Sequence, residues 1–240
     1  MPRGRLHEKH VQQVALKQLD LRYGSRAGVQ AMVAEPEVRV SKHSKIGFGR
    51  ADGLVASLMP DGSVYTAALE AKSARTLPNI MLRYRDKQWF LHALVAGLVG
   101  LLLIGSIGWL FTETWLLKWV LPIVAFFGAG FAYLLLTAEH ARYRLIDVVR
   151  QVKRYPANER WIAVSADAYN RLANDLRDAL HTACRNEGIG LLRVRSAAQV
   201  AFLEEPRQQR PPKGLNDFLE CYARLNAIRQ RLRTMAESRK

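Results

Sequence analysis

Two long apolar runs dominate the pattern of hydrophobic and polar positions along the chain. Residues 93–112 and residues 119–138 each continue for 20 positions without a charged side chain. At about 1.5 Å of rise per helical residue, each run is long enough to cross the roughly 30 Å hydrocarbon core of a bilayer. A helix at the surface of a soluble core would carry a polar stripe, and neither run has one. The pattern therefore predicts a transmembrane helical hairpin over residues 90–138, embedded in a lipid bilayer.

Only a few residues around Glu113 connect the two runs, so the segments before and after the hairpin must lie on the same side of the membrane. Basic residues flank the hairpin at both ends, whereas the turn carries one acidic residue. The positive-inside rule then places both termini in the cytoplasm, in a two-helix protein of the inner or plasma membrane. The flanking basic residues are Arg83, Arg85, Lys87, Arg142 and Arg144.

Small residues in both runs allow close helix contact, either inside the hairpin or with a second copy of the chain or a partner protein. They occur as pairs four positions apart, which share one face of a helix. The pairs are Ala93/Gly97, Ala96/Gly100, Ala125/Ala129 and Gly128/Ala132.

The segment before the hairpin changes from a helical to an extended pattern. Apolar spacing predicts a helix over about residues 5–21. Residues 37–59 are rich in β-forming residues, and VYTAALEAK gives a further strand after the turn signal at residues 60–63. We therefore expect a three-stranded meander whose last two strands form a hairpin over residues 52–72. A helix over about residues 77–90 should then lead into the membrane.

The segment after the hairpin alternates between helices and strands. The predicted elements are a helix at 139–155, a strand at 161–165, a helix at 167–186, strands at 190–196 and 199–205, and a last helix at 214–238. RQQRPPKG reads as a polar linker before that last helix. This order predicts an α/β sandwich. A doubly wound nucleotide-binding fold is disfavoured because no glycine-rich turn follows a first strand and no GKS or GKT occurs.

The charge balance points to a polyanionic partner. The chain has 36 Lys and Arg against 21 Asp and Glu, a formal net charge of +15. Lys118 and Glu113 cancel within the hairpin, so the excess lies on the other segments. Such a surface attracts nucleic acid or anionic lipid headgroups. The two cysteines, Cys184 and Cys221, lie far apart and give neither a disulfide framework nor a zinc motif.

Three residues of the predicted β-hairpin carry candidate chemistry. Asp52 opens one strand, and Glu70 and Lys72 close the other, on one face of that strand. Two neighbouring carboxylates bind Mg²⁺ or Mn²⁺ through hard oxygen ligands. A nearby lysine can orient or deprotonate a water molecule that attacks a phosphodiester, while the metal stabilises the developing charge. The competing interpretation is an ordinary solvated strand face that carries a Glu-x-Lys pair.

The length of the hairpin loop decides whether the three side chains meet. A four-residue loop at 60–63 would place Asp52 and Glu70 on opposite faces of the sheet. A three-residue loop, Asp61-Gly62-Ser63, pairs Asp52 with Lys72 and brings all three residues to one face. We therefore expect the three-residue loop, or a β-bulge near Asp52.

With 17 residues between Asp52 and the Glu-x-Lys at positions 70–72, the sequence resembles the PD-(D/E)xK, or restriction-endonuclease-like, nuclease superfamily. Gln151 and Tyr155 match the QxxxY helix motif of its RecB-like members. The resemblance implies a mixed central sheet flanked by helices, interrupted here by the membrane hairpin. It divides the chain into a first half of the nuclease domain (1–89), the hairpin (90–138), a second half (139–206), and a linker with a C-terminal amphipathic helix (207–240).

The resemblance also assigns roles to individual residues. Asp52 and Glu70 would hold the metal ion, Lys72 would act on the water molecule, and Gln151 and Tyr155 would steady the site or contact DNA. Glu8 on the first helix is a candidate accessory metal ligand, with an ordinary exposed acid as the alternative. Candidate phosphate contacts flank the motif residues, although each also fits a generally basic surface; these are Arg50, Arg75 and Arg154.

Two functional hypotheses follow. The first is a membrane-anchored, Mg²⁺-dependent endodeoxyribonuclease on the cytoplasmic face, for which DNA rather than RNA is favoured by analogy with the superfamily. The second is a catalytically inactive nuclease-like module that tethers DNA or a protein partner to the membrane. A weaker third hypothesis is a membrane effector whose hairpin oligomerises while the remaining domain senses a ligand. The complete set of motif residues favours the first.

Overall fold

The computed structural model describes residues 7–42, 44, 46–76, 82–84, 86–111, 113–137, 144–196 and 199–238. These residues fall into two compact units. The first unit combines Met1–Met81 with Ile146–Lys240, and the second is Leu82–Leu145. The segments on both sides of the predicted membrane hairpin therefore fold together, and the C-terminal segment after residue 206 belongs to the same unit.

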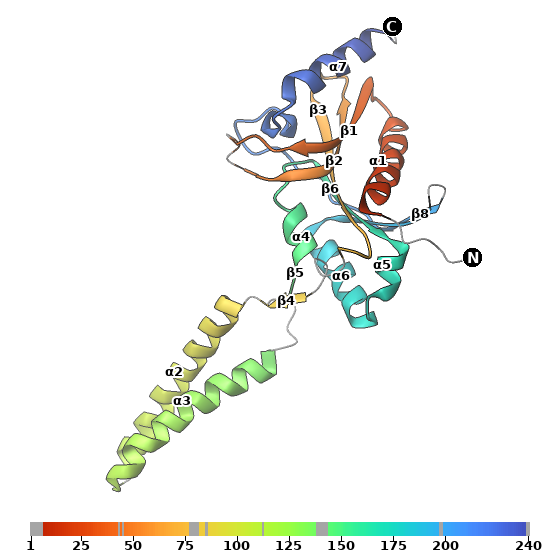
Figure 1. Cartoon of the computed structure of the whole chain (residues 1–240). Helices are drawn as coiled ribbons and strands as arrows, with labels where there is room; N and C mark the ends of the chain where they lie inside the picture. The colour runs from red at the N-terminus through yellow and green to blue at the C-terminus, as the bar shows by residue number, and fades with distance from the viewer. Residues whose placement is uncertain are drawn as a thin grey trace, which may run out of the picture. The chain divides into compact units, whose positions relative to one another are not determined.

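A six-stranded mixed sheet forms the centre of the first unit, with the strand order β1-β2-β3-β6-β7-β8 (Figure 1). The strands are β1 (Ala31–Arg39), β2 (Arg50–Leu58), β3 (Val64–Lys72), β6 (Glu159–Ser165), β7 (Gly190–Ser196) and β8 (Gln199–Glu204). The pairs β1–β2, β2–β3 and β7–β8 are antiparallel, whereas β3–β6 and β6–β7 are parallel. The expected meander of three strands is present. Strand β3 occupies the middle of the sheet, between β2 and β6.

The loop between β2 and β3 is longer than expected. Leu58 pairs with Val64, which leaves a loop of residues 59–63 in place of the predicted three residues. The Asp61 side chain accepts hydrogen bonds from the backbone and hydroxyl of Ser63, and Gly62 has a φ of 80°, so the extra residues form a tight turn. Lengthening the loop by two residues preserves the alternation. The regular pairs end at Gly53–Leu69, one position before Asp52 and Glu70, and a register with this parity would keep those two side chains on one face.

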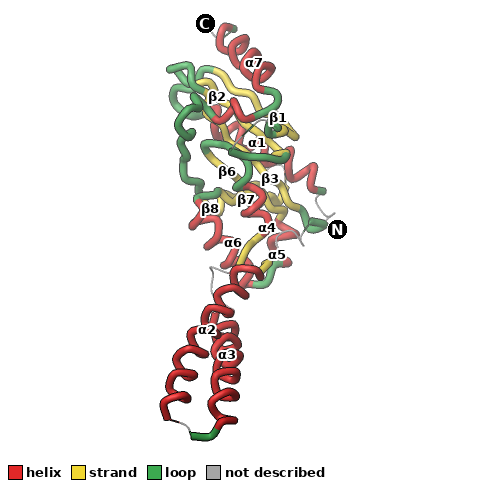
Figure 2. Tube along the Cα trace, turned by 90° about the vertical axis from the view of Figure 1, so that its left-hand side faces the viewer, coloured by secondary structure: helices red, strands yellow, loops and turns green. Residues whose placement is uncertain are grey.

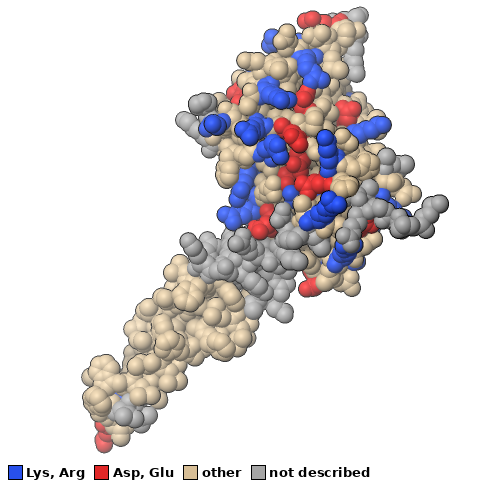
Figure 3. All heavy atoms as spheres, viewed as in Figure 1, with Lys and Arg blue, Asp and Glu red and all other residues tan. Residues whose placement is uncertain are grey.

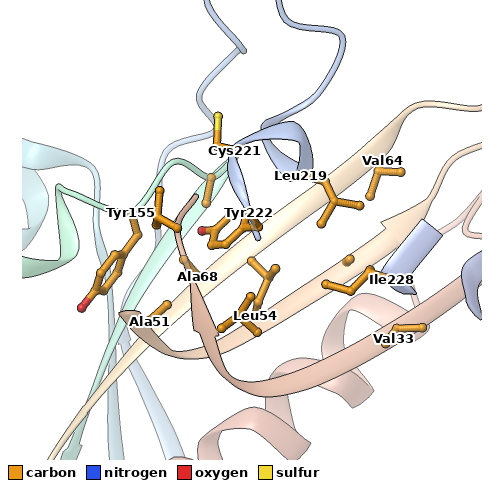
Figure 4. Packing of buried hydrophobic residues seen from close by; sticks show 14 of the residues in the cluster. Val33, Ala51, Leu54, Val64, Ala68, Tyr155, Leu219, Cys221, Tyr222 and Ile228 are labelled. Carbon is orange, nitrogen blue, oxygen red and sulfur yellow. The ribbon is translucent and has the colours of Figure 1, made fainter. Parts of the chain in front are cut away.

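Apolar layers cover both faces of the sheet. Helix α1 (Glu8–Gly24) packs its apolar side onto one face, against residues such as Leu69, Trp161 and Leu192. The other face is covered in part by the 3-10 helix η2 (Phe218–Cys221) and by helix α7 (Leu225–Glu237). Figure 4 shows this second cluster, to which Tyr155 also belongs. With both faces covered, β3 is buried almost throughout its length.

The second unit contains the two apolar helices, α2 (Asp86–Phe111) and α3 (Trp115–Thr137), side by side (Figure 2). Both are long and apolar enough to cross a membrane, and many of their large apolar side chains are exposed. On the face drawn in Figure 3, their described surface carries almost no charge. The small residues face each other inside the hairpin. A Cβ added to Gly97 would lie 2.7 Å from the Phe126 carbonyl oxygen, and one on Gly100 2.8 Å from the Ala129 Cβ. Gly128 has open space instead.

Two of the predicted helices are replaced in part by strands. In place of continuous helices at 77–90 and 139–155, residues Leu82–Tyr84 and Arg144–Ile146 form the paired strands β4 and β5. A short helix α4 (Asp147–Val152) follows β5. Residues 77–81, 85 and 139–143 of these ranges lie outside the described residues.

Two other predicted helices are interrupted. The helix expected over 167–186 is divided into α5 (Ala166–Arg171) and α6 (Asn174–Glu187). The Arg177 side chain donates to the carbonyls of Tyr169 and Asn170, which satisfies acceptors freed by the break. The helix expected over 214–238 is broken at Tyr222, whose backbone forms a bridge with Val40. The tertiary contact overrides the helical pattern there.

Candidate active site

The site begins with Glu70 and Lys72 on the central strand β3. Glu70 is 1% exposed, and Lys72 is 4% exposed. Lys72 Nζ lies 2.5 Å from Glu70 Oε1, so the two side chains form a buried ion pair. A solvated strand face is thereby excluded for this Glu-x-Lys pair. Burying both charges costs free energy unless each is well partnered, which explains why further polar groups gather around them.

Tyr155 and Gln151 reach this pair from the part of the chain that follows the two apolar helices. The Tyr155 hydroxyl donates a 2.8 Å hydrogen bond to Glu70 Oε2. Gln151 Nε2 in turn donates to the Tyr155 hydroxyl at 3.2 Å. Figure 4 shows the Tyr155 hydroxyl pointing away from the labelled apolar residues around its ring. Both carboxylate oxygens of Glu70 are therefore held by hydrogen bonds, one from each half of the predicted domain.

Asp52 lies where strand β2 departs from its regular pairing. The regular pairing of β2 with β3 ends at Gly53–Leu69. Glu37, which lies between the β1 residues that pair with Gly53 and Ala51, has a φ of 53°. The Asp52 carboxylate accepts the backbone N–H of Ala71 at 2.8 Å, instead of a regular ladder bond. This contact turns the carboxylate toward the strand that carries Glu70 and Lys72. Gln12 on α1 donates to the Asp52 carbonyl and holds this end of β2.

Both acids have raised pKa values, so a nearby cation would stabilise their ionised forms. Burial and, after it, the neighbouring Asp52 charge raise the pKa of Glu70 to about 7, against the opposing effects of Lys72 and Tyr155. Burial also raises the pKa of Asp52, although the Ala71 N–H bond opposes the change. Two acids with raised pKa values on one face of a sheet suit a divalent ion, which reverses the repulsion between them.

The two acids supply oxygen donors, the kind of ligand that Mg²⁺ and Mn²⁺ prefer. Among the described residues, no group of three or more His, Cys, Asp or Glu gathers around one point. Mg²⁺ usually needs only one or two protein carboxylates and keeps several water molecules for its remaining positions. Asp52 and Glu70 are two such carboxylates, too few for an all-protein zinc or calcium cage.

Glu8 lies at the start of α1, near the same end of the sheet. Its carboxylate accepts a 2.6 Å hydrogen bond from the Thr76 hydroxyl, which also accepts the backbone N–H of Ser73. The Glu8 charge also contributes to the raised pKa of Asp52. Glu8 is therefore electrostatically coupled to the site, while its described hydrogen bond ties α1 to the turn after β3.

The three predicted phosphate contacts have different surroundings. Arg50, at the start of β2, forms an exposed ion pair with Glu37 at 3.3 Å. Arg75 is exposed in the turn after β3. The Arg154 guanidinium lies 4.8 Å from the centre of the Phe48 ring, next to Tyr155 in sequence. Arg50 lies two positions before Asp52, Arg75 three positions after Lys72, and Arg154 directly before Tyr155, where it faces an aromatic ring.

Sequence reasoning missed Gln12 and Phe48. Gln12 has no motif to identify it, because its contact with Asp52 depends on how α1 packs. Phe48 gave a weak signal, an aromatic residue between two glycines shortly before Asp52.

No family model matches the sequence, and no curated protein or solved structure matches it either. The assignment of a function therefore depends on the geometry of the site.

Proposed function

We propose that this chain is a membrane-anchored, metal-dependent nuclease that hydrolyses DNA phosphodiester bonds, with a restriction-endonuclease-like fold. The observation that carries the proposal is the Glu70–Lys72 pair, buried in the central strand and bonded to Tyr155 from the other side of the hairpin. Asp52 extends from the neighbouring strand to the backbone of the same segment. A scaffold that only binds a partner has no need for a buried carboxylate, lysine and second carboxylate in this arrangement.

The protein residues have distinct tasks in the proposed reaction. Lys72 orients a water molecule through its ammonium group. The water oxygen forms a bond to phosphorus while the water proton passes to solvent. The bridging P–O bond breaks, and the departing sugar oxygen takes a proton from solvent. Tyr155 and Gln151 fix the orientation of the Glu70 carboxylate, so that it keeps its place when Lys72 turns toward the water.

Asp52 and Glu70 would hold the metal ion, with Glu8 as an accessory ligand, and the bound Mg²⁺ or Mn²⁺ would supply charge stabilisation at the phosphate. Metal binding also requires both carboxylates to be ionised, so affinity depends on pH. Arg50, Arg75 and Arg154 would contact the phosphates of the DNA on either side of the cleaved bond.

The two apolar helices would anchor the enzyme in the inner or plasma membrane, with both termini in the cytoplasm. The short connection between α2 and α3 and the basic residues on both flanks support this topology. The lipid bilayer is then a partner of the second unit, and DNA is the partner of the first. A second copy of the chain or a partner protein would meet the remaining exposed face of the hairpin, where Gly128 leaves open space.

The decisive experiment is plasmid cleavage by the detergent-solubilised full-length protein in the presence of Mg²⁺, Mn²⁺ or EDTA. We expect nicking or linearisation with either metal ion and intact plasmid in EDTA. DNA binding without cleavage under every metal condition would favour a catalytically inactive tethering module.

A further inference from the structure

Beside the candidate active site, the loop between β1 and β2 presents an exposed aromatic ring. Phe48 is 61% exposed, although it belongs to the most strongly apolar class of side chains. Its backbone N–H donates to the carbonyl of Arg154 at 3.3 Å, and the Arg154 guanidinium lies 4.8 Å from the ring centre. The same residue therefore holds the loop through its backbone and faces the ring through its side chain.

The two glycines beside Phe48 show that this loop is closely fitted to its support. A Cβ added to Gly47 would lie 2.5 Å from the Arg154 carbonyl oxygen and 2.6 Å from the Pro156 ring. Gly49 has a φ of 103°, which other residues rarely adopt, and its Cβ position lies 3.5 Å from the Tyr155 ring. Any larger residue at either position would displace the loop. Phe48 is thus presented at a fixed place, one residue from the contact with Tyr155.

The surroundings of Phe48 suit a nucleic acid. A hollow of about 500 Å³ lies beside the ring, and its lining includes the basic residues Lys42, Lys153 and Arg154. Lys153 also forms an ion pair with Glu187 at 2.7 Å, and the described residues that line the hollow include no acid. Figure 3 shows Lys and Arg side chains along the side of the unit where α4 and the β1–β2 loop lie. A basic hollow with one flat, exposed ring combines the two elements of single-strand binding sites.

We propose that Phe48 and Arg154 form a stacking platform for an unpaired base of the nucleic-acid substrate. This inference rests on the proposed nuclease function and narrows its substrate to DNA with a single-stranded segment beside the cleaved phosphate. The Phe48 ring receives the base on its free side, while the Arg154 guanidinium supports the ring from the protein side. A fully paired duplex has no base available for this contact.

Binding of labelled oligonucleotides to the full-length protein in detergent and EDTA tests the platform. We compare a single-stranded thymidine oligonucleotide with a blunt duplex of the same length by fluorescence anisotropy. Phe48→Ala should weaken single-strand binding by about tenfold, the usual loss for one stacked base, and change duplex binding less than twofold. Phe48→Trp should restore single-strand binding. Leu21→Ala, which removes a similarly exposed apolar side chain (59%) from α1, should change neither.

Three results would overturn the platform: unchanged single-strand binding by Phe48→Ala, an equal loss for both ligands, or no rescue by tryptophan. Anionic lipid is the competing partner of a basic, apolar loop. A Phe48→Cys variant carrying an environment-sensitive dye, placed in nanodiscs, separates the two, because both native cysteines are buried. A spectral shift on adding the oligonucleotide supports the platform. A shift that requires phosphatidylglycerol and ignores the oligonucleotide contradicts it.

The binding assay contains no metal ion, so its outcome is independent of cleavage. Phe48-dependent single-strand binding by a protein that never cuts plasmid would refute the nuclease and leave the platform standing. Metal-dependent cleavage with Phe48-independent binding would refute the platform alone.

Discussion

The Tyr155 hydroxyl donates a 2.8 Å hydrogen bond to Glu70 Oε2, although the two residues are 85 positions apart and the two apolar helices lie between them in sequence. This contact requires the segments before and after the hairpin to close into one folded unit, as the sequence motifs predicted. An insertion between β3 and α4 is compatible with a sheet in which β3 and β6 pair in parallel, since such a connection must be long in any case.

Replacing Tyr155 with Phe should lower cleavage without loss of folding. The variant removes one hydrogen bond to a buried carboxylate, and that bond normally lowers the pKa of Glu70. At neutral pH we expect a loss of about tenfold in kcat, consistent with a hydrogen bond to a charged group. The loss should shrink as the pH rises, because Glu70 then ionises in the variant as well.

Tyr65→Phe is the matched control, since the Tyr65 hydroxyl also bonds a buried carboxylate, that of Glu159, outside the candidate site. Its pH–rate profile should overlay that of the wild type. If the Tyr155 and Tyr65 variants shift the profile alike, the Tyr155–Glu70 bond has no special part in the reaction.

The second prediction concerns the three proposed catalytic residues. Asp52→Ala, Glu70→Ala and Lys72→Ala should each reduce plasmid cleavage by several orders of magnitude, because these groups act as a unit. DNA binding should persist within a few-fold, since the excess positive charge remains. Nicking of supercoiled plasmid and a gel-shift assay measure the two properties on the same preparation. A Lys72→Ala protein that cuts as well as the wild type would show that the assignment is wrong.

Glu70 should also give the protein an unusual pH dependence of stability. Its pKa of about 7 in the folded protein exceeds the ordinary value of 4.5, so the folded state binds the proton more tightly than the unfolded state. The resulting stabilisation is complete below about pH 4.5 and is lost as the pH rises through about 7, by roughly 3 kcal/mol at most. In EDTA, raising the pH over this range should therefore lower the unfolding temperature of the wild type relative to that of Glu70→Gln.

Magnesium provides the control for that measurement. At pH 8, Mg²⁺ should raise the unfolding temperature of the wild type and leave that of Glu70→Gln nearly unchanged, because binding stabilises only the protein that holds the ion. A pH-independent difference between the two proteins, or equal stabilisation by Mg²⁺, would argue against Glu70 as a titrating metal ligand.

Local patterns predicted the central elements of the first unit well, and tertiary contacts explain most of the errors. Strands β3, β6 and β7 follow from apolar, β-branched runs whose character does not depend on distant residues. The break at Tyr222 does depend on them, because Ser41 and Arg39 form backbone hydrogen bonds with Cys221 and Ala223. The amphipathic pattern there correctly predicted buried side chains and incorrectly predicted a continuous helix.

The residues of the candidate site that belong to sequence motifs could be predicted. Glu70 and Lys72 could be placed on one face from their spacing alone, and the QxxxY motif gave Tyr155. The hairpin loop was predicted two residues too short. A change of two residues keeps the parity of the loop, and parity alone decides which side chains share a face of the sheet. Phe48 could not be assigned, since its exposure depends on how Gly47 and Gly49 fit against Arg154 and Tyr155.

The final prediction concerns the membrane. If α2 and α3 cross the bilayer, Glu113 in their connection and Lys240 at the end of the sequence must lie on opposite sides. The basic flanks favour a cytoplasmic location for the termini, so a cysteine placed at Glu113 faces outward. In intact cells, a membrane-impermeant maleimide should therefore label Glu113→Cys and fail to label Lys240→Cys until the cells are opened. Cys184 and Cys221 are buried and give a low background.

Labelling of the Lys240 variant alone would invert the topology and put the candidate nuclease site outside the cytoplasm. Labelling of both in intact cells would mean that the two helices do not cross the bilayer, and the proposed anchor would have to be abandoned.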